Sequence, residues 1–180
     1  IKGIHPKTKE DIVRKLNDND PFTALAFKVV TDKNGDLTFL RIYSGSLRAG
    51  SKVYNASRDK SDRVSRVLLV HASDKEDIEC ATSGTIVAVV GLKNVFTGDT
   101  ICDQSKPILL EKMEFPEPVV ELLVEPKTNA DQDKLSLALQ KMLVADPSLK
   151  VSVDEDTAQT ILRGMGELHL EIIVERLRNN

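Results

Sequence analysis

The sequence lacks several features on which particular functions depend. Tryptophan is absent and aromatic residues make up 4% of the chain, so the core must rest on valine, leucine and isoleucine. No apolar run approaches the roughly 18 residues of a membrane span, and we expect no membrane partner. The N-terminus, Ile1-Lys2-Gly3, has neither an initiator methionine nor a signal-peptide layout. We therefore expect a segment of a longer, cytoplasmic protein.

Cysteine is equally scarce. Cys80 and Cys102 stand in separate apolar segments without CxxC spacing, which gives neither a disulfide framework nor a zinc site. Two small buried thiols in a reducing compartment are the expected arrangement. The enzymatic alternative is a hydrolase that uses Cys80 or Cys102 as nucleophile, for instance Cys80 paired with His71, and no local pattern supports it.

Motifs that bind phosphate or metal are also missing. The chain has no G-x-x-x-x-G-K-[ST] loop. The stretch GMGELH, from Gly164, begins like a dinucleotide fingerprint, but His169 stands where the third glycine is required. Asp154-Glu155-Asp156 lacks the ligand spacing of a calcium loop. We expect no catalytic residue, cofactor or metal ion in this chain.

Charge is distributed unevenly along the sequence. Residues 1–115 carry 18 basic and 16 acidic residues, whereas residues 116–180 carry 7 and 12. Within the first part, only Asp59 and Asp62 oppose a local basic stripe, which consists of Arg48, Lys52, Arg58, Lys60, Arg63 and Arg66. Such a stripe can attract a phosphate backbone, but charge alone favours a solvated loop face.

The first part of the chain is strand-like. Residues 1–20 are polar and predict a linker, which ends at the turn signal Asp18-Asn19-Asp20-Pro21. Short runs rich in β-branched residues then alternate with Gly, Asp and Ser, which predicts a closed antiparallel β-barrel over 21–106. The expected strands are Phe22–Thr31, Leu37–Ser44, Lys52–Asn55, Arg63–Ala72, Gly84–Val90 and Asp99–Cys102, with a tight turn at Asp32–Asp36.

The character of the sequence changes at Pro107. Three prolines in residues 107–118 predict a second linker. The remaining residues, 119–180, predict the order β-α-β-β-α, with Thr128 or Asn129 capping the first helix. A split βαβ (ferredoxin-like) α+β domain has one more strand, so we expect this domain to lack its last strand and to leave a sheet edge open.

The last predicted helix, Gly166 to Arg178, has an unusually broad apolar surface. On a helical wheel four charged residues form a narrow polar side, and apolar residues cover nearly all the rest. A helix on one sheet face needs a stripe only a little over 100° wide, so we expect one flank to pack on its own sheet and the other to contact something else. His169 falls inside the apolar arc, either as a satisfied core histidine or as a docking residue.

Long collinear stretches of the sequence resemble the elongation factor G family of ribosomal translocase GTPases. PFTALAFKVVTDKNGDLTFLRIYSG and GLKNVFTGDTICD resemble the two ends of that family's second domain. MEFPEPVVELLVEPKT, DQDKLSLALQKMLVADPSLKV and TILRGMGELHLEIIVERL resemble its third domain. The stretch Ala49 to Ser65 matches poorly, and Leu149 stands where the family often has an aromatic residue.

The resemblance implies roles that spacing alone does not give. GTP and magnesium would bind in the family's GTPase domain, outside this chain. The barrel would contact that domain and small-subunit ribosomal RNA through an edge that contains Arg41, Tyr43, Ser44, Gly45, Arg48 and Lys52. The third domain would contact a small-subunit protein, and its second helix would face the GTPase domain with Gly166, Glu167, His169, Glu171 and Arg176.

Two other functions stay open at this point. The chain could be a stand-alone RNA-binding module that uses the basic stripe. It could also be the same region of a related ribosome-recycling or ribosome-protection GTPase, since those proteins share parts of this layout.

Overall fold

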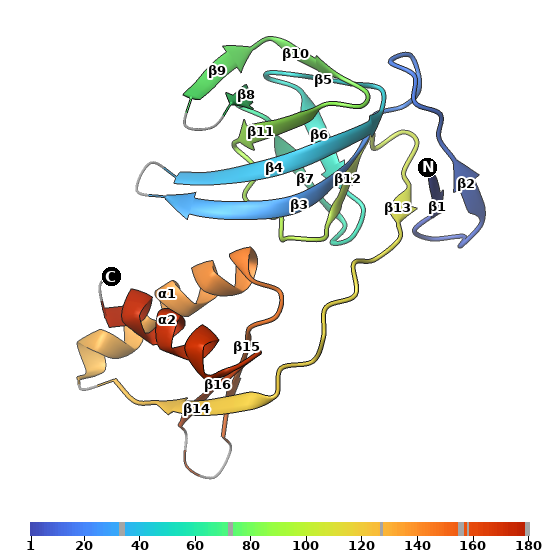
Figure 1. Cartoon of the computed structure of the whole chain (residues 1–180). Coiled ribbons are helices and arrows are strands. Elements are labelled where there is room, and N and C mark those ends of the chain that lie inside the picture. Colours follow the sequence, from blue (N-terminus) through green and yellow to red (C-terminus); the bar gives the residue numbers. More distant parts are fainter. Residues whose placement is uncertain (33–34, 72–73, 127, 155–156, 158, 179–180) are drawn as a thin grey trace. The chain divides into compact units, whose positions relative to one another are not determined.

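We describe a computed structural model of the chain, which covers all residues except 33–34, 72–73, 127, 155–156, 158 and 179–180. The chain divides into two compact units, Ile1–Met113 and Glu114–Asn180 (Figure 1). The change of unit falls inside the segment 107–118 that the prolines mark as a linker.

The first unit consists of short strands, all of them paired antiparallel. They are β1 (Lys2–Ile4), β2 (Asp11–Val13), β3 (Thr23–Asp32), β4 (Gly35–Ser44), β5 (Ser46–Arg48), β6 (Lys52–Asn55), β7 (Lys60–Arg63), β8 (Arg66–His71), β9 (Asp74–Ile78), β10 (Cys80–Thr82), β11 (Ile86–Val90), β12 (Thr100–Cys102) and β13 (Leu109–Leu110). The main sheet has the order β7-β6-β12-β3-β4-β11-β8-β9, and β10 pairs with β5.

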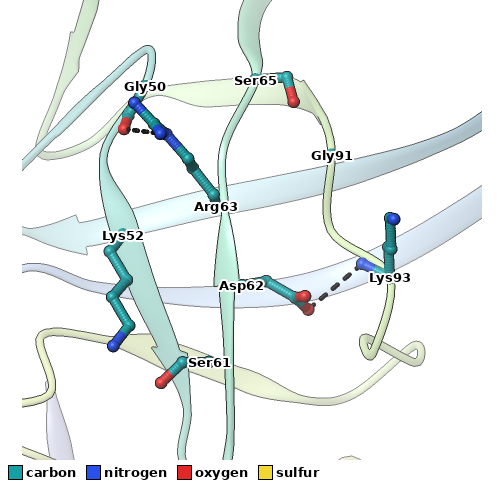
Figure 2. A pocket seen from close by; sticks show the side chains of 8 residues that line it. All are labelled: Gly50, Lys52, Ser61, Asp62, Arg63, Ser65, Gly91 and Lys93. Carbon is teal, nitrogen blue, oxygen red and sulfur yellow. Dashed lines mark hydrogen bonds between the residues drawn. The ribbon is translucent and has the colours of Figure 1, made fainter.

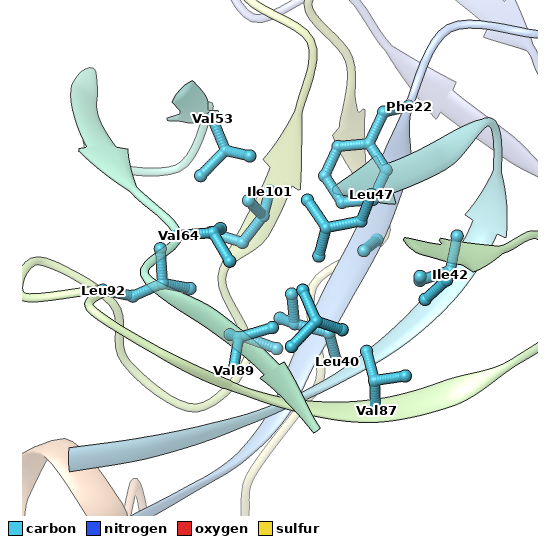
Figure 3. Packing of buried hydrophobic residues seen from close by; sticks show 14 of the residues in the cluster. Phe22, Leu40, Ile42, Leu47, Val53, Val64, Val87, Val89, Leu92 and Ile101 are labelled. Atoms are coloured by element: carbon cyan, nitrogen blue, oxygen red, sulfur yellow. The ribbon is translucent and has the colours of Figure 1, made fainter. Parts of the chain in front are cut away.

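The main sheet curls around one large buried cluster. Val53 of β6 and Val87 and Val89 of β11 belong to one buried cluster, although three strands lie between β6 and β11 in the sheet. Side chains from β6 and from β11 converge in this cluster (Figure 3). Backbone hydrogen bonds outside the strand ladders, from Ser65 N to Val90 O and from Gly50 N to Val64 O, join the β7–β8 connection to β11 and to the residues before β6. The antiparallel barrel class expected for the first domain is confirmed, but the expected closure is not seen, because no ladder between the described strands joins β7 to β9.

The N-terminal segment differs from the linker that its polar sequence predicts. Residues 1–20 contain β1 and β2, which form a three-stranded sheet with β13. Ile12 of β2 packs against a buried cluster that includes Tyr54, Cys102 and Ile108. Strands of three residues are too short to show an alternating pattern, so the sequence did not predict them.

The strand predicted over Arg63–Ala72 is also divided. β7 ends at Arg63 and β8 begins at Arg66, while Ala72 lies outside the described residues. Val64 stands between the two strands and is fully buried in the core. The break between the strands therefore contains a buried apolar residue, as a strand would, so the pattern of apolar and polar residues could not reveal it.

The second unit has the predicted order β-α-β-β-α. Its elements are β14 (Val120–Val124), α1 (Asn129–Ala145), β15 (Lys150–Val153), β16 (Thr160–Gly164) and α2 (Glu167–Arg178). The sheet that the described residues form has the order β14-β16-β15, so β14 and β15 are its edges. Leu139 of α1, Leu162 of β16 and Ile173 of α2 share one core. Thr128 caps α1 by accepting a hydrogen bond from Asp131 N at 3.2 Å.

Candidate functional site

The predicted contact edge of the first unit combines structural and exposed residues. Ser44 is fully buried, and its hydroxyl donates to Pro21 O at 2.8 Å. Gly45 has φ of +71°, and a Cβ there would lie 2.6 Å from backbone atoms of Phe22. Both residues therefore hold the chain entering β3 against the end of β4, and neither presents a side chain to a partner.

The other four predicted residues are more accessible. Arg41, Arg48 and Lys52 are exposed. Tyr43 is half-buried against the cluster that contains Tyr54 and Cys102, and the Arg41 guanidinium lies 5.7 Å from the centre of its ring. Three exposed cations on β4, β5 and β6 are thus available on this edge.

The basic stripe separates into engaged and available cations. Arg66 forms an ion pair with Asp77, from Nη2 to Oδ2 at 2.5 Å. The Arg58 guanidinium lies 3.5 Å from the centre of the Phe96 ring and donates through Nε to Asp99 Oδ2 at 2.8 Å. Lys52 and Arg63 form no ion pair among the described residues, and they are register partners in the β6–β7 pair.

An open pocket of about 610 Å³ lies at these two strands (Figure 2). Its walls are Gly50, Lys52, Ser61, Asp62, Arg63, Ser65, Gly91 and Lys93. The Lys52 ammonium and the Ser61 hydroxyl lie on the same side of the β6–β7 pair (Figure 2). Arg63 Nε donates to Gly50 O at 2.9 Å, which fixes its guanidinium at the pocket wall.

The single carboxylate in the pocket wall already accepts hydrogen bonds from the backbone. Asp62 accepts from the backbone N–H of Lys93 at 3.2 Å and of Asn94 at 3.0 Å. These bonds bring Lys93 to the pocket, and the stripe did not include it because it lies 31 positions beyond Asp62. Gly91 permits this approach, since a Cβ there would lie 2.4 Å from Ser65 Oγ.

In the second unit, helix α2 shows the two flanks that its sequence predicts. Leu170 and Ile173 are buried in the core of the unit. Leu168 and Ile172, one turn apart, are 69% and 42% exposed. Glu167, Glu171 and Arg176 are also exposed, whereas Gly166 is half-buried just before the helix. An apolar flank is therefore open to solvent beside a charged one.

His169 of the same helix is bound within its own unit. Its Nδ1 accepts from Met165 N at 3.1 Å, and its Nε2 donates to Asp146 Oδ2 at 2.8 Å. Burial would raise the pKa of Asp146, but hydrogen bonds from Ser148 and His169 outweigh it and lower that pKa overall. Because both ring nitrogens are engaged, His169 has no free lone pair for general-base chemistry. The sequence left two roles open for His169, and these contacts favour a histidine whose hydrogen bonds are satisfied within its own unit over a docking residue.

The GMG sequence before α2 is a strand-to-helix turn, as expected. Gly164 ends β16, and a Cβ there would lie 2.7 Å from Leu170 Cδ2 and 3.0 Å from His169 Nδ1. The missing side chain therefore lets the first turn of α2 fold back over the end of the strand.

The cysteines offer little nucleophilic chemistry. Cys102 is fully buried, and burial raises the pKa of its thiol. Cys80 is half-buried in β10, whereas His71 is exposed at the end of β8. The described residues contain no group of three or more His, Cys, Asp or Glu side chains that could hold a metal ion. Within the same residues, neither helix is long and apolar enough to cross a membrane.

Comparison with known proteins gives consistent matches along the chain. A model of elongation factor G domain 2 matches residues 21–104, and a model of elongation factor G domain III matches residues 115–180. Elongation factor G 2 of Syntrophus aciditrophicus (strain SB) is 54% identical over 177 residues, which is 98% of this chain and 26% of that relative.

A crystal structure of a Thermus thermophilus protein superposes with a TM-score of 0.73 and 31% identity. It covers 88% of this chain, which in turn covers 24% of the solved chain. The chain thus spans about a quarter of the length of both relatives.

Proposed function

Because the chain belongs to the elongation factor G family, of which it carries domains 2 and 3, we propose that it is the ribosome-binding and interdomain-signalling part of a cytoplasmic translational GTPase. In this proposal residues 21–106 and 119–180 are the two domains. Hydrolysis, with GTP and magnesium, belongs to a separate GTPase domain. The chain itself supports GTP-driven translocation by binding and by transmitting conformational change.

The observation that carries this proposal is the open apolar flank of α2. Leu168 and Ile172 remain exposed although Leu170 and Ile173 of the same helix are buried. An apolar flank beside charged residues is typical of a docking surface. We assign its partner as the GTPase domain, with Glu167, Glu171 and Arg176 at the rim of the contact. Gly166 and His169 then shape the start of the helix from inside the unit.

The exposed cations of the barrel edge complete the proposal. Arg41, Arg48 and Lys52 are candidates to contact small-subunit ribosomal RNA, since cations neutralise phosphate groups. Ser44 and Gly45 hold the backbone of this edge in place, and Tyr43 supports the Arg41 guanidinium through its ring. The third domain additionally contacts a protein of the small subunit.

The proposal is tested in the full-length factor with two matched substitutions, Leu168→Ser and Leu137→Ser. Both leucines are helical and more than half exposed, so neither change should lower the unfolding midpoint appreciably. We expect Leu168→Ser to slow ribosome-dependent translocation about tenfold, as loss of about 1.4 kcal/mol of docking energy would. Leu137→Ser should leave the rate unchanged. Equal rates for the two variants would refute docking through α2.

A second measurement tests where the chemistry lies. We expect the 180-residue chain alone to bind no GTP at micromolar concentration. Tight binding of GTP to this chain would refute the assignment of the nucleotide site to another domain.

A further inference from the structure

We propose that Asp146 is a positioning residue for helix α2, because its carboxylate holds the His169 ring in the tautomer whose Nδ1 accepts a hydrogen bond from Met165 N. The inference rests on the proposed function, in which α2 docks through its open flank, and it identifies what fixes the start of that flank. Met165 and Leu168, at the beginning of the helix, are 37% and 69% exposed.

The turn before α2 has no side chain at the usual capping position. The helix begins at Glu167, so Gly166 stands where Ser, Thr, Asp or Asn would normally accept from the first backbone N–H groups. Three residues later, His169 reaches back and accepts from Met165 N at 3.1 Å. A Glu or Gln reaches back from this position in a similar way in a capping box. His169 therefore fixes the entry of the chain into the helix, which Gly166 has no side chain to do.

An imidazole differs from Glu or Gln in that it accepts at Nδ1 only while that nitrogen carries no proton. Met165 N is a backbone donor, so its bond requires a neutral His169 ring with the proton on Nε2. That nitrogen lies 2.8 Å from Asp146 Oδ2. The hydrogen bond at one ring nitrogen sets which of the two is protonated. The Asp146 carboxylate therefore keeps Nδ1 available as the acceptor for Met165.

Asp146 suits this role because its own orientation is fixed. It is the C-cap residue of α1, and its Oδ1 accepts from Ser148 N at 2.9 Å and from Ser148 Oγ at 2.6 Å. Oδ2 is thereby directed to the His169 ring. Burial would raise the pKa of Asp146, but the hydrogen bonds from Ser148 and His169 lower it overall. The carboxylate is therefore ionised at neutral pH, where it can only accept.

These contacts fix the direction of the open flank. Leu168 directly precedes His169, and Leu170, which follows it, is buried in the core of the unit. With the His169 ring held at both nitrogens, the first turn of α2 has one orientation. Leu168 is then held on the solvent side, where a partner can reach it.

The first test is the tautomer of His169 in the 180-residue chain, measured by long-range nitrogen-15 spectra at mildly alkaline pH, where imidazole groups are neutral. The chain has three histidines, so His169→Asn identifies the signals. We expect the wild-type ring to carry its proton on Nε2. In Asp146→Asn the amide oxygen stays with the Ser148 donors, so the NH₂ group faces His169 and shifts the ring proton to Nδ1. An unchanged tautomer in Asp146→Asn, or a protonated Nδ1 in the wild type, would overturn the proposal.

The second test is hydrogen exchange of the Met165 amide. Loss of its bond to Nδ1 should make exchange about fivefold faster in Asp146→Asn, as expected for one hydrogen bond. Adding His169→Asn should restore slow exchange, because the Asn oxygen follows Cγ as Nδ1 does and accepts whichever residue stands at position 146. If Asp146 acted only by holding Ser148, exchange would be equally fast in the single and the double variant, and the proposal would be wrong.

Translocation by the full-length factor, below the unfolding midpoint of every variant, connects these contacts to docking. We expect Asp146→Asn to slow it about fivefold, the change that one lost hydrogen bond gives. Asp133→Asn, the same substitution at an exposed position of α1, should leave the rate unchanged. If Leu168→Ser slows translocation but Asp146→Asn does not, the positioning role fails and the proposed function stands. If Leu168→Ser translocates normally, the proposed function fails, while the tautomer and the Met165 exchange rate still decide whether Asp146 positions the helix.

Discussion

Substitution of Asp99 should destabilise the first unit more than any exposed carboxylate. Its side chain is almost fully buried, and its Oδ2 accepts from Asn55 Nδ2 at 2.8 Å, Arg58 Nε at 2.8 Å and Phe96 N at 2.9 Å. Asp99→Ala removes the acceptor and leaves three donors without it. Asn55 keeps its bond to Asn94 O, and Arg58 is partly exposed, so those two losses are incomplete.

The magnitude follows from these contacts. A hydrogen bond to a charged group contributes about 1.5–3 kcal/mol and a buried unsatisfied donor costs about 1–3 kcal/mol. With one full loss and two partial ones, we expect Asp99→Ala to cost about 3–4 kcal/mol. Asp99→Asn keeps an oxygen acceptor but loses the charge, and we expect about half that loss.

The measurement is thermal unfolding followed by circular dichroism, together with hydrogen exchange of the peptides that contain Asn55 and Phe96. A loss of about 3 kcal/mol lowers the midpoint of a domain of this size by roughly 12–20 °C. Asp77→Ala, which removes a carboxylate from an exposed ion pair, should leave the midpoint nearly unchanged. The reasoning fails if Asp99→Ala and Asp77→Ala have equal midpoints, or if Asp99→Asn is the more destabilising change at Asp99.

Two further predictions concern stability. Gly45→Ala should cost more than about 3 kcal/mol in urea unfolding, because the new Cβ would overlap backbone atoms of Phe22 at a positive φ; a loss below about 1 kcal/mol would contradict the steric argument. Asp146→Asn should remove acid sensitivity. The folded pKa of Asp146 is lowered, so its contribution is full above the unfolded value of about 3.9 and is lost as pH falls through the folded pKa. Urea midpoints of wild type and Asp146→Asn should therefore converge below about pH 4, and a constant difference down to acid pH would contradict this.

The sequence predicts those elements whose side chains alternate or recur with a clear period. The pair β3–β4 was predicted because Leu40 and Ile42 alternate with outward-facing residues, and α2 because its apolar residues follow the helical period. β9 was not predicted, since Asp74–Ile78 is polar and its first four residues are exposed. An edge strand needs only backbone pairing with one neighbour, which leaves no apolar pattern in the sequence.

The candidate pocket could be predicted only in part for a similar reason. Lys52 and Arg63 stood out because they belong to a charged stretch of sequence. Lys93 did not, because its position depends on hydrogen bonds from its own turn to the distant Asp62 carboxylate. The stripe also included Arg58, whose structural partner Asp99 lies 41 positions away. Composition identifies the cations, but long-range contacts decide which of them remain available to a ligand.

Long-range contacts, which the sequence does not show, also decide the role of His169 in α2. Its place in the apolar arc was compatible with docking or with burial, because a helical wheel shows the direction of each side chain but not the residues that it contacts. Asp146, 23 positions earlier, ends α1 and meets the His169 ring, while the Met165 N–H donates to that ring at its other nitrogen. The His169 side chain therefore links the end of α1 to the start of α2, and its first role is to hold the two helices of its own unit together. Loss of His169 should therefore move α2 relative to α1, and any effect on docking through Leu168 would follow from that movement.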